Sequence, residues 1–494
     1  MDAYVQDLVT VLQRNGHRSV LRHAGIDTTA AALVAAVSRY ARALESLGVG
    51  PGDLVAVFAP NRPEALAVRY GAHLAGAGVM FLPAPTDADR RARLVAQVDP
   101  RLLVVFPETA GLLPDGVAAP VAAVGAVPGI ALRLDALAAG LDDRPPPCRA
   151  RSGDLAVVVP SGGTTGVPKG SRRDFAGYTA MVAGPARTDR RQLANGSLAH
   201  LTQVLVDQTL LGGGTVVLQD HYDAVATLSA IESERVTDLF LVEPQLFDLM
   251  DRPEVARYDL GSLQTLTHVG ALAPPVLRAR ARARLGPVVA HTYGCSEVGI
   301  VSALSPAEHD RPSRFSCSGH VLPGVRVRFR RSDGSIDPRA GAVEVRAPGM
   351  AEGYRNRPAE EAAVFVDGWY RTGDLGCLDD EGMLRVLGRV ADMVGPGTVL
   401  PVDLQETVCH LPSVRYAVVV PDAARGVRVV AAEAWPGGEV DLGSCRAAVT
   451  AVHGREVASS VQVLRVDRVP LTEQGKPDRA ALRASAAAVA EVCA

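Results

Sequence analysis

The chain has 494 residues, of which 48% are hydrophobic and 21% are charged. This length and composition suit a folded protein with more than one domain and argue against wholesale disorder. Its 51 basic and 54 acidic residues nearly cancel and no block of like charge dominates, so we expect neither a nucleic-acid-binding protein nor a membrane-surface protein.

Cysteine usage and the N-terminal stretch predict a cytoplasmic protein. The seven cysteines are odd in number and include no CxxC pair, which is unlike a disulfide framework or a zinc ribbon. Residues 1–19 break their apolar run with Asp, Gln and Arg, so they do not resemble a signal peptide. No segment approaches the roughly 18 uninterrupted apolar residues of a membrane-spanning helix.

The first 150 residues alternate short apolar runs with longer helical patterns. Strands are predicted at 54–58, 79–82 and 102–106, each a short apolar run. Helices are predicted at 33–47, where apolar residues recur at helical spacing, and at 65–77. Strands separated by helices favour parallel sheets covered by helices.

The alternation continues along the rest of the chain. Further strands are predicted at 154–159, 215–218, 239–242 and 266–268, and turn-punctuated β structure is predicted at 323–350 and 364–388. The last hundred residues contain a predicted helix at 402–410, strands at 416–420 and 427–435, and an alanine-rich end at 480–494 that is either helical or frayed. We therefore predict an α/β fold: a large N-terminal domain of parallel-sheet layers plus a β-rich part, and a small, mobile α+β C-terminal domain.

Four arginines alternate with small apolar residues in one segment, at Arg278, Arg280, Arg282 and Arg284. This alternation indicates the solvated face of a helix rather than a site for a polyanion.

The strongest local signal is a loop rich in glycine and hydroxyl residues, which follows the predicted strand at 154–159. Residues 160–170 read Pro-Ser-Gly-Gly-Thr-Thr-Gly-Val-Pro-Lys-Gly. Glycine lets backbone N–H groups approach a ligand closely, and hydroxyls and one lysine add donors, so the loop suits phosphate binding. It is not a Walker A loop, because a proline precedes the lysine. The binding candidates are Ser161, Gly162, Gly163, Thr164, Thr165 and Lys169.

This loop resembles the phosphate loop of the adenylate-forming superfamily, which includes acyl-CoA synthetases, luciferases, nonribosomal adenylation domains and aryl-acid ligases. The Ser-Gly-Gly-Thr-Thr-Gly form is most similar to the aryl-acid ligase variant. Four more motifs follow in the family's order, so the five span residues 160–479. The resemblance implies an enzyme that uses ATP and Mg²⁺ to activate a carboxylic acid as acyl-AMP.

The second motif, Tyr293-Gly-Cys-Ser-Glu297, resembles the family's Tyr-Gly-x-Thr-Glu. An aromatic ring can stack on adenine, and a carboxylate can hold Mg²⁺ on nucleotide phosphates. The resemblance implies these roles for Tyr293 and Glu297, and a phosphate contact for Ser296. We expect Thr292 at the same nucleotide site.

Two further motifs are implied to hold the ribose. Residues 369–376 read Trp-Tyr-Arg-Thr-Gly-Asp-Leu-Gly, in which Asp374 is the implied acceptor from the ribose hydroxyls. The pair Gly388-Arg389 matches the family's domain junction, with Arg389 also bonding the ribose. The predicted domains are therefore 1–388, which binds AMP and the acid, and 389–494, a C-terminal lid.

The last motif supplies the expected catalytic lysine. Residues 470–479 read Pro-Leu-Thr-Glu-Gln-Gly-Lys-Pro-Asp-Arg and resemble the family's Pro-x-Thr-x-x-Gly-Lys-x-Asp-Arg. When a carboxylate attacks the α-phosphorus of ATP and expels pyrophosphate, the two anions repel each other. Lys476 can bridge them, by positioning and electrostatic stabilisation rather than covalent chemistry. The lid is expected to move between the two half-reactions.

The acid is predicted to be aryl or fatty-type. His200 occupies the position of a pocket-lining histidine in acyl- and aryl-CoA ligases, and we place it with Lys476 among the catalytic candidates, although a core role is equally open. Amino-acid-activating relatives use an aspartate in this region; Asp207 fits that register poorly but stays open. Gly270 and Ala271, with Gly294, leave room for a flat or extended apolar acid.

Two departures from the family's pattern concern the acceptor. Members usually carry an Asp or Lys hinge two residues after the Gly-Arg arginine, whereas this chain has Ala391 and then Asp392. The following loop, 394–401, is shorter than the usual Gly-Gly-rich loop that helps to admit a phosphopantetheine thiol, and two prolines stiffen it. We therefore favour transfer of the acyl group to an amine, as in standalone amide bond synthetases.

Two alternatives stay open. If the departures are neutral, the enzyme forms a CoA thioester and CoA is its second substrate. A non-catalytic nucleotide- or acyl-binding relative is the third reading, which the joint retention of Lys476, Glu297, Asp374 and Arg389 disfavours.

Overall fold

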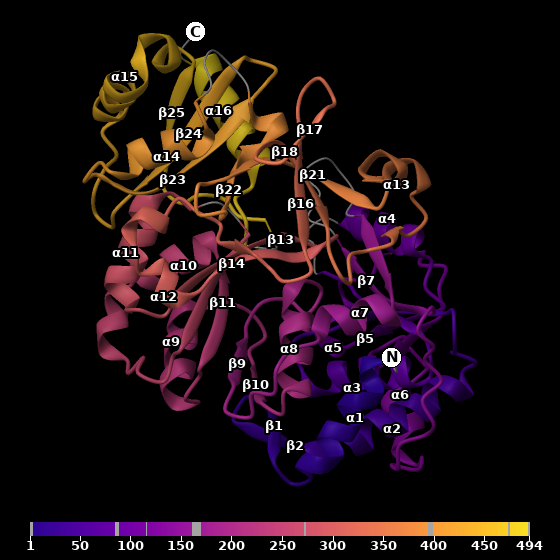
Figure 1. Cartoon of the computed structure of the whole chain (residues 1–494). Helices are drawn as coiled ribbons and strands as arrows, with labels where there is room; N and C mark the ends of the chain where they lie inside the picture. The colour runs from indigo at the N-terminus through magenta and orange to yellow at the C-terminus, as the bar shows by residue number, and fades with distance from the viewer. Residues whose placement is uncertain are drawn as a thin grey trace.

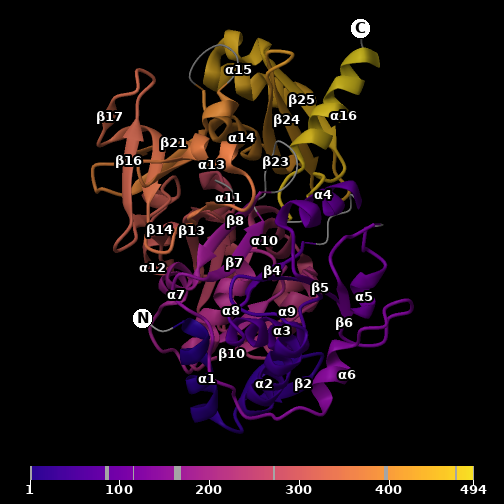
Figure 2. The same cartoon turned by 90° about the vertical axis from the view of Figure 1, so that its right-hand side faces the viewer.

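The computed structural model describes residues 3–83, 88–114, 116–160, 169–270, 273–393, 399–472 and 475–492. Within these ranges the chain forms four β-sheets with helices packed around them (Figures 1 and 2). Among the residues described, none of the helices combines the length and apolar character needed to cross a lipid bilayer.

The first large sheet has the strand order β19-β8-β7-β4-β3-β5-β6. Its strands are β3 (Leu54–Phe58), β4 (Gly78–Phe81), β5 (Leu102–Val105), β6 (Val121–Ala123), β7 (Leu155–Pro160), β8 (Gly170–Asp174) and β19 (Gly353–Tyr354). The strands from β3 to β7 pair in parallel, and β8 and β19 close one edge in antiparallel fashion. Every residue of β3 and β4 is buried, as parallel strands covered on both faces require.

The second large sheet has the order β15-β14-β13-β12-β11-β9-β10-β1-β2. Its strands are β1 (Ser19–His23), β2 (Ile26–Thr29), β9 (Arg191–Ala194), β10 (Thr215–Leu218), β11 (Asp238–Val242), β12 (Thr265–Val269), β13 (Val289–Cys295), β14 (Gly299–Leu304) and β15 (His320–Val321). The run from β13 to β1 is parallel. Carboxyl ends of parallel strands share one edge of a sheet, where ligands of open α/β sheets bind.

Helices cover both large sheets. They are α1 (Tyr4–Asn15), α2 (Ala30–Ser46), α3 (Pro63–Leu74), α4 (Ala88–Val98), α5 (Pro107–Ala110), α6 (Leu134–Ala139), α7 (Phe175–Val182), α8 (Leu201–Leu211), α9 (Ala224–Ser233), α10 (Glu243–Met250), α11 (Pro275–Leu285) and α12 (Pro306–His309). The interior is apolar, and one cluster of buried side chains runs from α1 to β10.

A third, antiparallel sheet forms the β-rich part. It comprises β16 (Arg326–Arg330), β17 (Ile336–Asp337), β18 (Ala340–Arg346), β20 (Phe365–Val366), β21 (Trp369–Leu378) and β22 (Leu384–Arg389), with α13 (Pro358–Val364) beside it. The small C-terminal domain holds β23 (Val414–Asp422), β24 (Val427–Ala434), β25 (Val461–Val466), α14 (Pro401–Cys409), α15 (Leu442–Ser459) and α16 (Arg479–Val492). Figure 1 shows this domain, in orange and yellow, on α10 and α11, and buried apolar residues of both parts form one cluster.

The structure confirms the predicted α/β fold and most predicted elements. The strands at 54–58 and 215–218 have the predicted bounds, and the other elements differ mainly at their ends. The helix predicted at 33–47 begins three residues earlier, because the Thr29 side chain accepts a hydrogen bond from the Ala32 N–H and caps the helix at Ala30. The alanine-rich end is helical in α16 as far as residue 492.

The alternating arginines of α11 correct one prediction. They lie on a helix, but Arg278 is only 1% exposed, so the four arginines do not form one solvated face. The Arg278 guanidinium donates to His309 Nε2 at 3.0 Å and to the Cys317 carbonyl at 2.8 Å. Arg280 is half-buried beneath the C-terminal domain. The pattern failed at these two positions because protein groups far away in the sequence bind their guanidinium groups.

A charged network lies at the centre of the N-terminal part. Asp207 of α8 and Arg69 of α3 are fully buried and pair at 2.8 Å. Tyr70 and Tyr178 donate to the two Asp207 oxygens, each at 2.6 Å. A buried charge pair is stable only when its polar atoms find such partners. Because three neighbours use Asp207 fully, it is not available to hold a substrate amine.

Replacing Asp207 by alanine should leave Arg69 as an unpaired buried charge. We expect Asp207→Ala to lower the free energy of unfolding by about 3–5 kcal/mol, measured by urea denaturation. Asp380→Ala is the matched control, because Asp380 pairs with Arg339 at 2.9 Å on the surface. It should leave the free energy of unfolding nearly unchanged. Equal destabilisation by the two variants would contradict this account.

Candidate active site

The candidate site lies where strands of both large sheets end and the C-terminal domain meets them. Strand β7 ends at Pro160, and β11 and β12 end side by side at Val242 and Val269, which are register partners. Gly270 follows β12 with φ +88°, a conformation that favours glycine. These chain ends converge because parallel strands present their carboxyl ends on the same edge.

A tight hairpin of the C-terminal domain presents Lys476 to this edge. Leu471 and Pro477 form an isolated antiparallel bridge, and the Thr472 N–H donates to the Lys476 carbonyl at 2.7 Å. A Cβ built on Gly475 would lie 3.0 Å from Val242 Cγ2, so glycine lets the hairpin approach β11. A Cβ built on Gly270 would lie only 3.2 Å from Lys476 Cε. The lysine therefore extends over the end of β12, against a residue without a side chain.

Several charged groups act on the Lys476 ammonium group. The side chain keeps solvent-accessible area, but protein atoms enclose much of it. This loss of water, together with the positive charge of Arg389, lowers the pKa of Lys476. Glu297 and Asp374 act in the opposite direction. The predicted lysine, ribose and metal motifs thus meet at one point.

His200, the residue before α8, lies in the same place. Burial, and then the charge of Lys476, lower its pKa to about 4, so the imidazole is neutral at pH 7. The Pro160 carbonyl opposes this shift by favouring the protonated ring. His200 thus lies near both the end of β7 and Lys476.

The implied ribose residues form a connected set. Asp374 of β21 and Arg389 of β22 are register partners, with Arg389 Nε 3.1 Å from Asp374 Oδ1. The Tyr293 hydroxyl donates to Asp374 Oδ2 at 2.6 Å. Burial raises the pKa of Asp374, and Arg389 opposes this by favouring the carboxylate. Tyr293 thus joins β13 to the β-rich part.

Glu297 is a buried carboxylate that the structure holds in place. It is 5% exposed, and its Oε1 accepts from the Tyr354 hydroxyl at 2.8 Å. The Lys169 ammonium lies 5.2 Å from the centre of the Tyr354 ring. The neighbouring Ser296 carbonyl accepts from Arg173 at 2.6 Å. Tyr354 therefore brings the lysine of the glycine-rich segment to the same place as Glu297.

Magnesium fits this arrangement. Among the described residues no group of three or more His, Cys, Asp or Glu side chains could hold a metal. A nucleotide-bound Mg²⁺ needs only one or two protein carboxylates, because phosphates and water supply its other ligands. The buried, oriented carboxylate of Glu297 meets that requirement.

Several predicted residues need separate mention. Ser161, Gly162, Gly163, Thr164, Thr165 and Ala271 lie outside the described residues. Thr292 lies in β13 opposite Ala303 of β14. Gly294 is required by this hairpin, since a Cβ there would lie 2.1 Å from the Gly299 carbonyl oxygen.

Sequence reasoning missed Arg173, Tyr354 and Val242. The Arg172-Arg173 pair directly after the glycine-rich segment was a usable signal, because two cations follow a predicted phosphate loop. Nothing in the sequence singled out Tyr354 or Val242, which reach the site through sheet pairing.

Both lysines of the chain lie in this site. Lys169 and Lys476 are the only two in the sequence, and arginine supplies every other Lys or Arg position. A lysine differs from arginine by its compact, movable ammonium group. The positions that keep lysine are therefore those where a point-like cation is useful.

Comparison with known proteins agrees with this geometry. Residues 9–355 match the AMP-binding enzyme family. The chain belongs to that family. It is similar to the medium/long-chain-fatty-acid–CoA ligase FadD8 of Mycobacterium tuberculosis, with 31% identity over 97% of this chain and 89% of that protein. It is also 31% identical to a feruloyl-CoA synthase of an Amycolatopsis species, over 93% of this chain and 94% of that one.

A solved structure is similarly close to this AMP-binding enzyme. The amide bond synthetase McbA of Marinactinospora thermotolerans is 30% identical, with a TM-score of 0.83, over 97% of this chain and 99% of that one. The AMP-binding enzyme described here therefore activates a carboxylic acid with ATP, as an acyl-adenylate. The acceptor of the acyl group is a separate question.

The contact between Gly270 and Lys476 can be tested by adding one methyl group. Gly270→Ala should displace the lysine and lower acid-dependent ATP–pyrophosphate exchange about tenfold, because small misplacements of a catalytic group are costly. Gly286→Ala is the matched control: Gly286 has a similar φ of +85°, but nothing lies within 4 Å of its built Cβ. Similar exchange rates in the two variants would contradict the contact's importance.

Proposed function

We propose that this enzyme joins an apolar aryl or fatty-type acid to an amine through an acyl-AMP intermediate, with Lys476 as the catalytic residue. The observation that carries this proposal is the placement of Lys476 over Gly270, beside His200 and within the charge field of Arg389, Asp374 and Glu297. We also propose that the domain boundary follows Gly388, one residue before β22 ends at Arg389.

The first half-reaction depends on charge placement. The substrate carboxylate attacks the α-phosphorus of ATP, the bond to the pyrophosphate oxygen breaks, and pyrophosphate leaves. The Lys476 ammonium group draws both anions together and stabilises the charge that grows on the phosphate oxygens. Because it is already fixed by its hairpin, little reorganisation is needed when the reaction occurs.

The nucleotide would be held by residues of the N-terminal part and the hinge. Tyr293 offers its ring to adenine, Asp374 accepts from the ribose hydroxyls, and Arg389 supports the same sugar. Lys169 and the segment before it would bind the phosphates, with Ser296 nearby. Glu297 would hold Mg²⁺, which when bound offsets the negative charge of the phosphates.

The nature of the acid is inferred from an apolar cluster beside His200. Phe240, Val242 and Val269, at the ends of β11 and β12, pack together and are each 8–9% exposed. Leu201 and Leu205 of α8 complete this cluster. With the imidazole of His200 neutral and Asp207 engaged elsewhere, this side of the site offers apolar surface and no anion for a substrate amine. An aryl or fatty-type acid suits it better than an amino acid.

An amine is the favoured acceptor on two grounds. The segment 394–401 is short and carries prolines where a thiol arm would enter, and the chain aligns along its length with a structure described as an amide bond synthetase. The amine nitrogen would attack the acyl carbon, the bond to the phosphate oxygen would break, and AMP and one proton would leave. A CoA thioester is the alternative, which the CoA-ligase names of similar proteins favour.

Removing the Lys476 ammonium group should abolish most adenylation. We expect Lys476→Ala to lower acid-dependent ATP–pyrophosphate exchange by at least about 10²-fold, the usual effect of deleting one preorganised charge, while circular dichroism stays unchanged. Arg455→Ala removes an exposed cation of the same domain and should leave exchange intact. Unchanged exchange in Lys476→Ala would rule out its catalytic role.

The acceptor can be identified by mass spectrometry. The enzyme is incubated with ATP, Mg²⁺ and a panel of aryl and fatty acids, and then with an amine or with CoA. We expect acyl-AMP to form with at least one acid and to convert to the amide without CoA. Preferential formation of a CoA thioester would support the alternative and overturn the amine assignment.

A further inference from the structure

The C-terminal domain packs against helix α10, and we call this contact the seat of the domain. Helix α10 presents three carboxyl groups to that domain. Glu243 is the first residue of the helix, Asp248 lies near its end, and Asp251 directly follows it. Apolar residues of α10 also share one buried cluster with α14 and β23. Contacts along this helix therefore set the orientation in which Lys476 is delivered.

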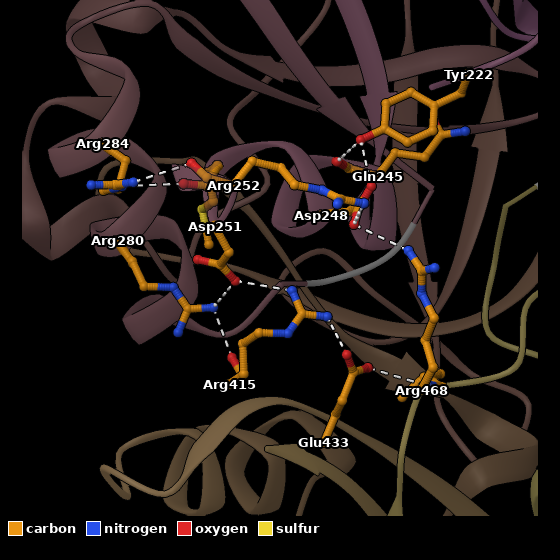
Figure 3. A network of polar contacts seen from close by, with 12 residues as sticks. Tyr222, Gln245, Asp248, Asp251, Arg252, Arg280, Arg284, Arg415, Glu433 and Arg468 are labelled. Atoms are coloured by element: carbon orange, nitrogen blue, oxygen red, sulfur yellow. Dashed lines mark hydrogen bonds and ion pairs between the residues drawn. The ribbon is translucent and has the colours of Figure 1, made fainter. Parts of the chain in front are cut away.

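The two acids at the far end of α10 are paired with arginines, as Figure 3 shows. Asp251 Oδ2 accepts from Arg280 of α11 at 3.0 Å and from Arg415 of β23 at 3.2 Å. Asp248 accepts from Arg468 of the C-terminal domain at 3.1 Å. Arg415 in turn pairs with Glu433 of β24. Each of these two carboxylates therefore has an arginine partner from the C-terminal domain.

Glu243 differs, because its partners are neutral. It is 3% exposed, and its Oε1 accepts from Gln405 Nε2 of α14 at 3.0 Å. The Tyr416 hydroxyl of β23 lies beside the same carboxyl group, buried and without a hydrogen-bond partner of standard geometry among the described residues. Among those residues no Lys, Arg or His forms an ion pair with Glu243. A carboxylate in this position would be a buried charge without a counter-charge, which is costly.

Within the part of the chain that the structure describes, no charged partner faces Glu243: hydrogen bonding by Gln405 and Tyr416 lowers its pKa, but burial has the larger effect. The groups that face it include the Tyr416 phenol and the Cys409 thiol of α14, and burial raises the pKa of both, so both are neutral at pH 7. Arg280 lowers the pKa of the Cys409 thiol and Glu406 raises it. The position of Glu243 in the first turn of α10 favours ionisation, but burial is the larger effect and raises its pKa to about 8.

A protonated Glu243 satisfies this environment. Its carbonyl oxygen can accept from Gln405 while its O–H donates to the oxygen of Tyr416. Val242, the preceding residue, lies between the hairpin and the end of β12, since it faces both Gly475 and Gly270. The seat on α10 and the position of Lys476 are therefore joined through adjacent residues of one chain segment.

We propose that Glu243 is a positioning residue for Lys476: its protonated carboxyl group seats the C-terminal domain on α10, and its ionisation weakens that seat. This inference rests on the proposed role of Lys476 in adenylation. Glu243 does not touch the reactants; it acts through the orientation of the domain.

The sign of the pH effect follows from the proton balance. In the seated form the pKa of Glu243 is about 8, whereas an exposed glutamate titrates near about 4.3. At pH values between these two pKa values, docking of the C-terminal domain on α10 therefore takes up a proton. The equilibrium constant for docking falls as the pH rises through that range, by up to about tenfold per pH unit. Above about 8 the effect levels off, because both forms are then ionised.

The test compares the pH dependence of Glu243→Gln with that of the unmodified enzyme. Glutamine keeps the shape and the hydrogen bonds of the protonated acid but does not ionise. We measure kcat and KM for ATP in acid-dependent ATP–pyrophosphate exchange from pH 6 to pH 9. The kcat ratio of variant to unmodified enzyme should rise at least about threefold over this range, because titrations common to both cancel. Glu456→Gln, an exposed glutamate of α15, should give a constant ratio.

A second measurement does not depend on catalysis. Hydrogen–deuterium exchange of residues 401–420 in the unmodified enzyme, corrected for the intrinsic pH dependence, should show protection that falls from pH 6 to pH 8. A constant kcat ratio for Glu243→Gln, a change confined to KM for ATP, or pH-independent protection would each overturn the proposal. Such results leave the role of Lys476 intact, since that role fails only if Lys476→Ala retains normal exchange.

Discussion

In the mechanism that we propose, activity depends on how one ammonium group from the C-terminal domain approaches the end of a strand in the N-terminal part. Lys476 extends over Gly270, and its hairpin rests on Val242 through Gly475. Both contacts exist because two glycines lack a Cβ where backbone and side chain must pass closely. The distance between the catalytic cation and the neighbouring charged groups is therefore set by packing between domains rather than by local chain geometry.

Partial burial shapes the electrostatics of the site. It lowers the pKa values of His200 and Lys476 and raises the pKa of Asp374. Burial acts at the interface on α10 as well. There Asp248 and Asp251 have arginine partners, whereas Glu243, with neutral partners, has a pKa of about 8.

Similarity to CoA ligases and to an amide bond synthetase is explained by what these enzymes have in common. In our proposal the residues near Lys476 serve the adenylation half-reaction, which does not depend on the acceptor, and the choice of acceptor depends on the segment after Arg389. There Asp392 pairs with Arg479, which ties the hinge region to the start of α16. The hinge is thus attached to the same segment that carries Lys476.

Much of this protein is determined by local sequence. Apolar runs such as Leu54–Phe58 predict their strands because burial on both faces requires continuous hydrophobicity, and five short motifs predict adenylation chemistry because each needs particular side chains at fixed spacing. Only the tertiary structure decided the rest. It buried Arg278 and committed Asp207 to Arg69, it brought Tyr354 to Glu297, and it gave Glu243 neutral partners from another domain. These outcomes depend on residues far apart in the chain, and a periodic pattern records which face of an element is apolar but not which partner covers it.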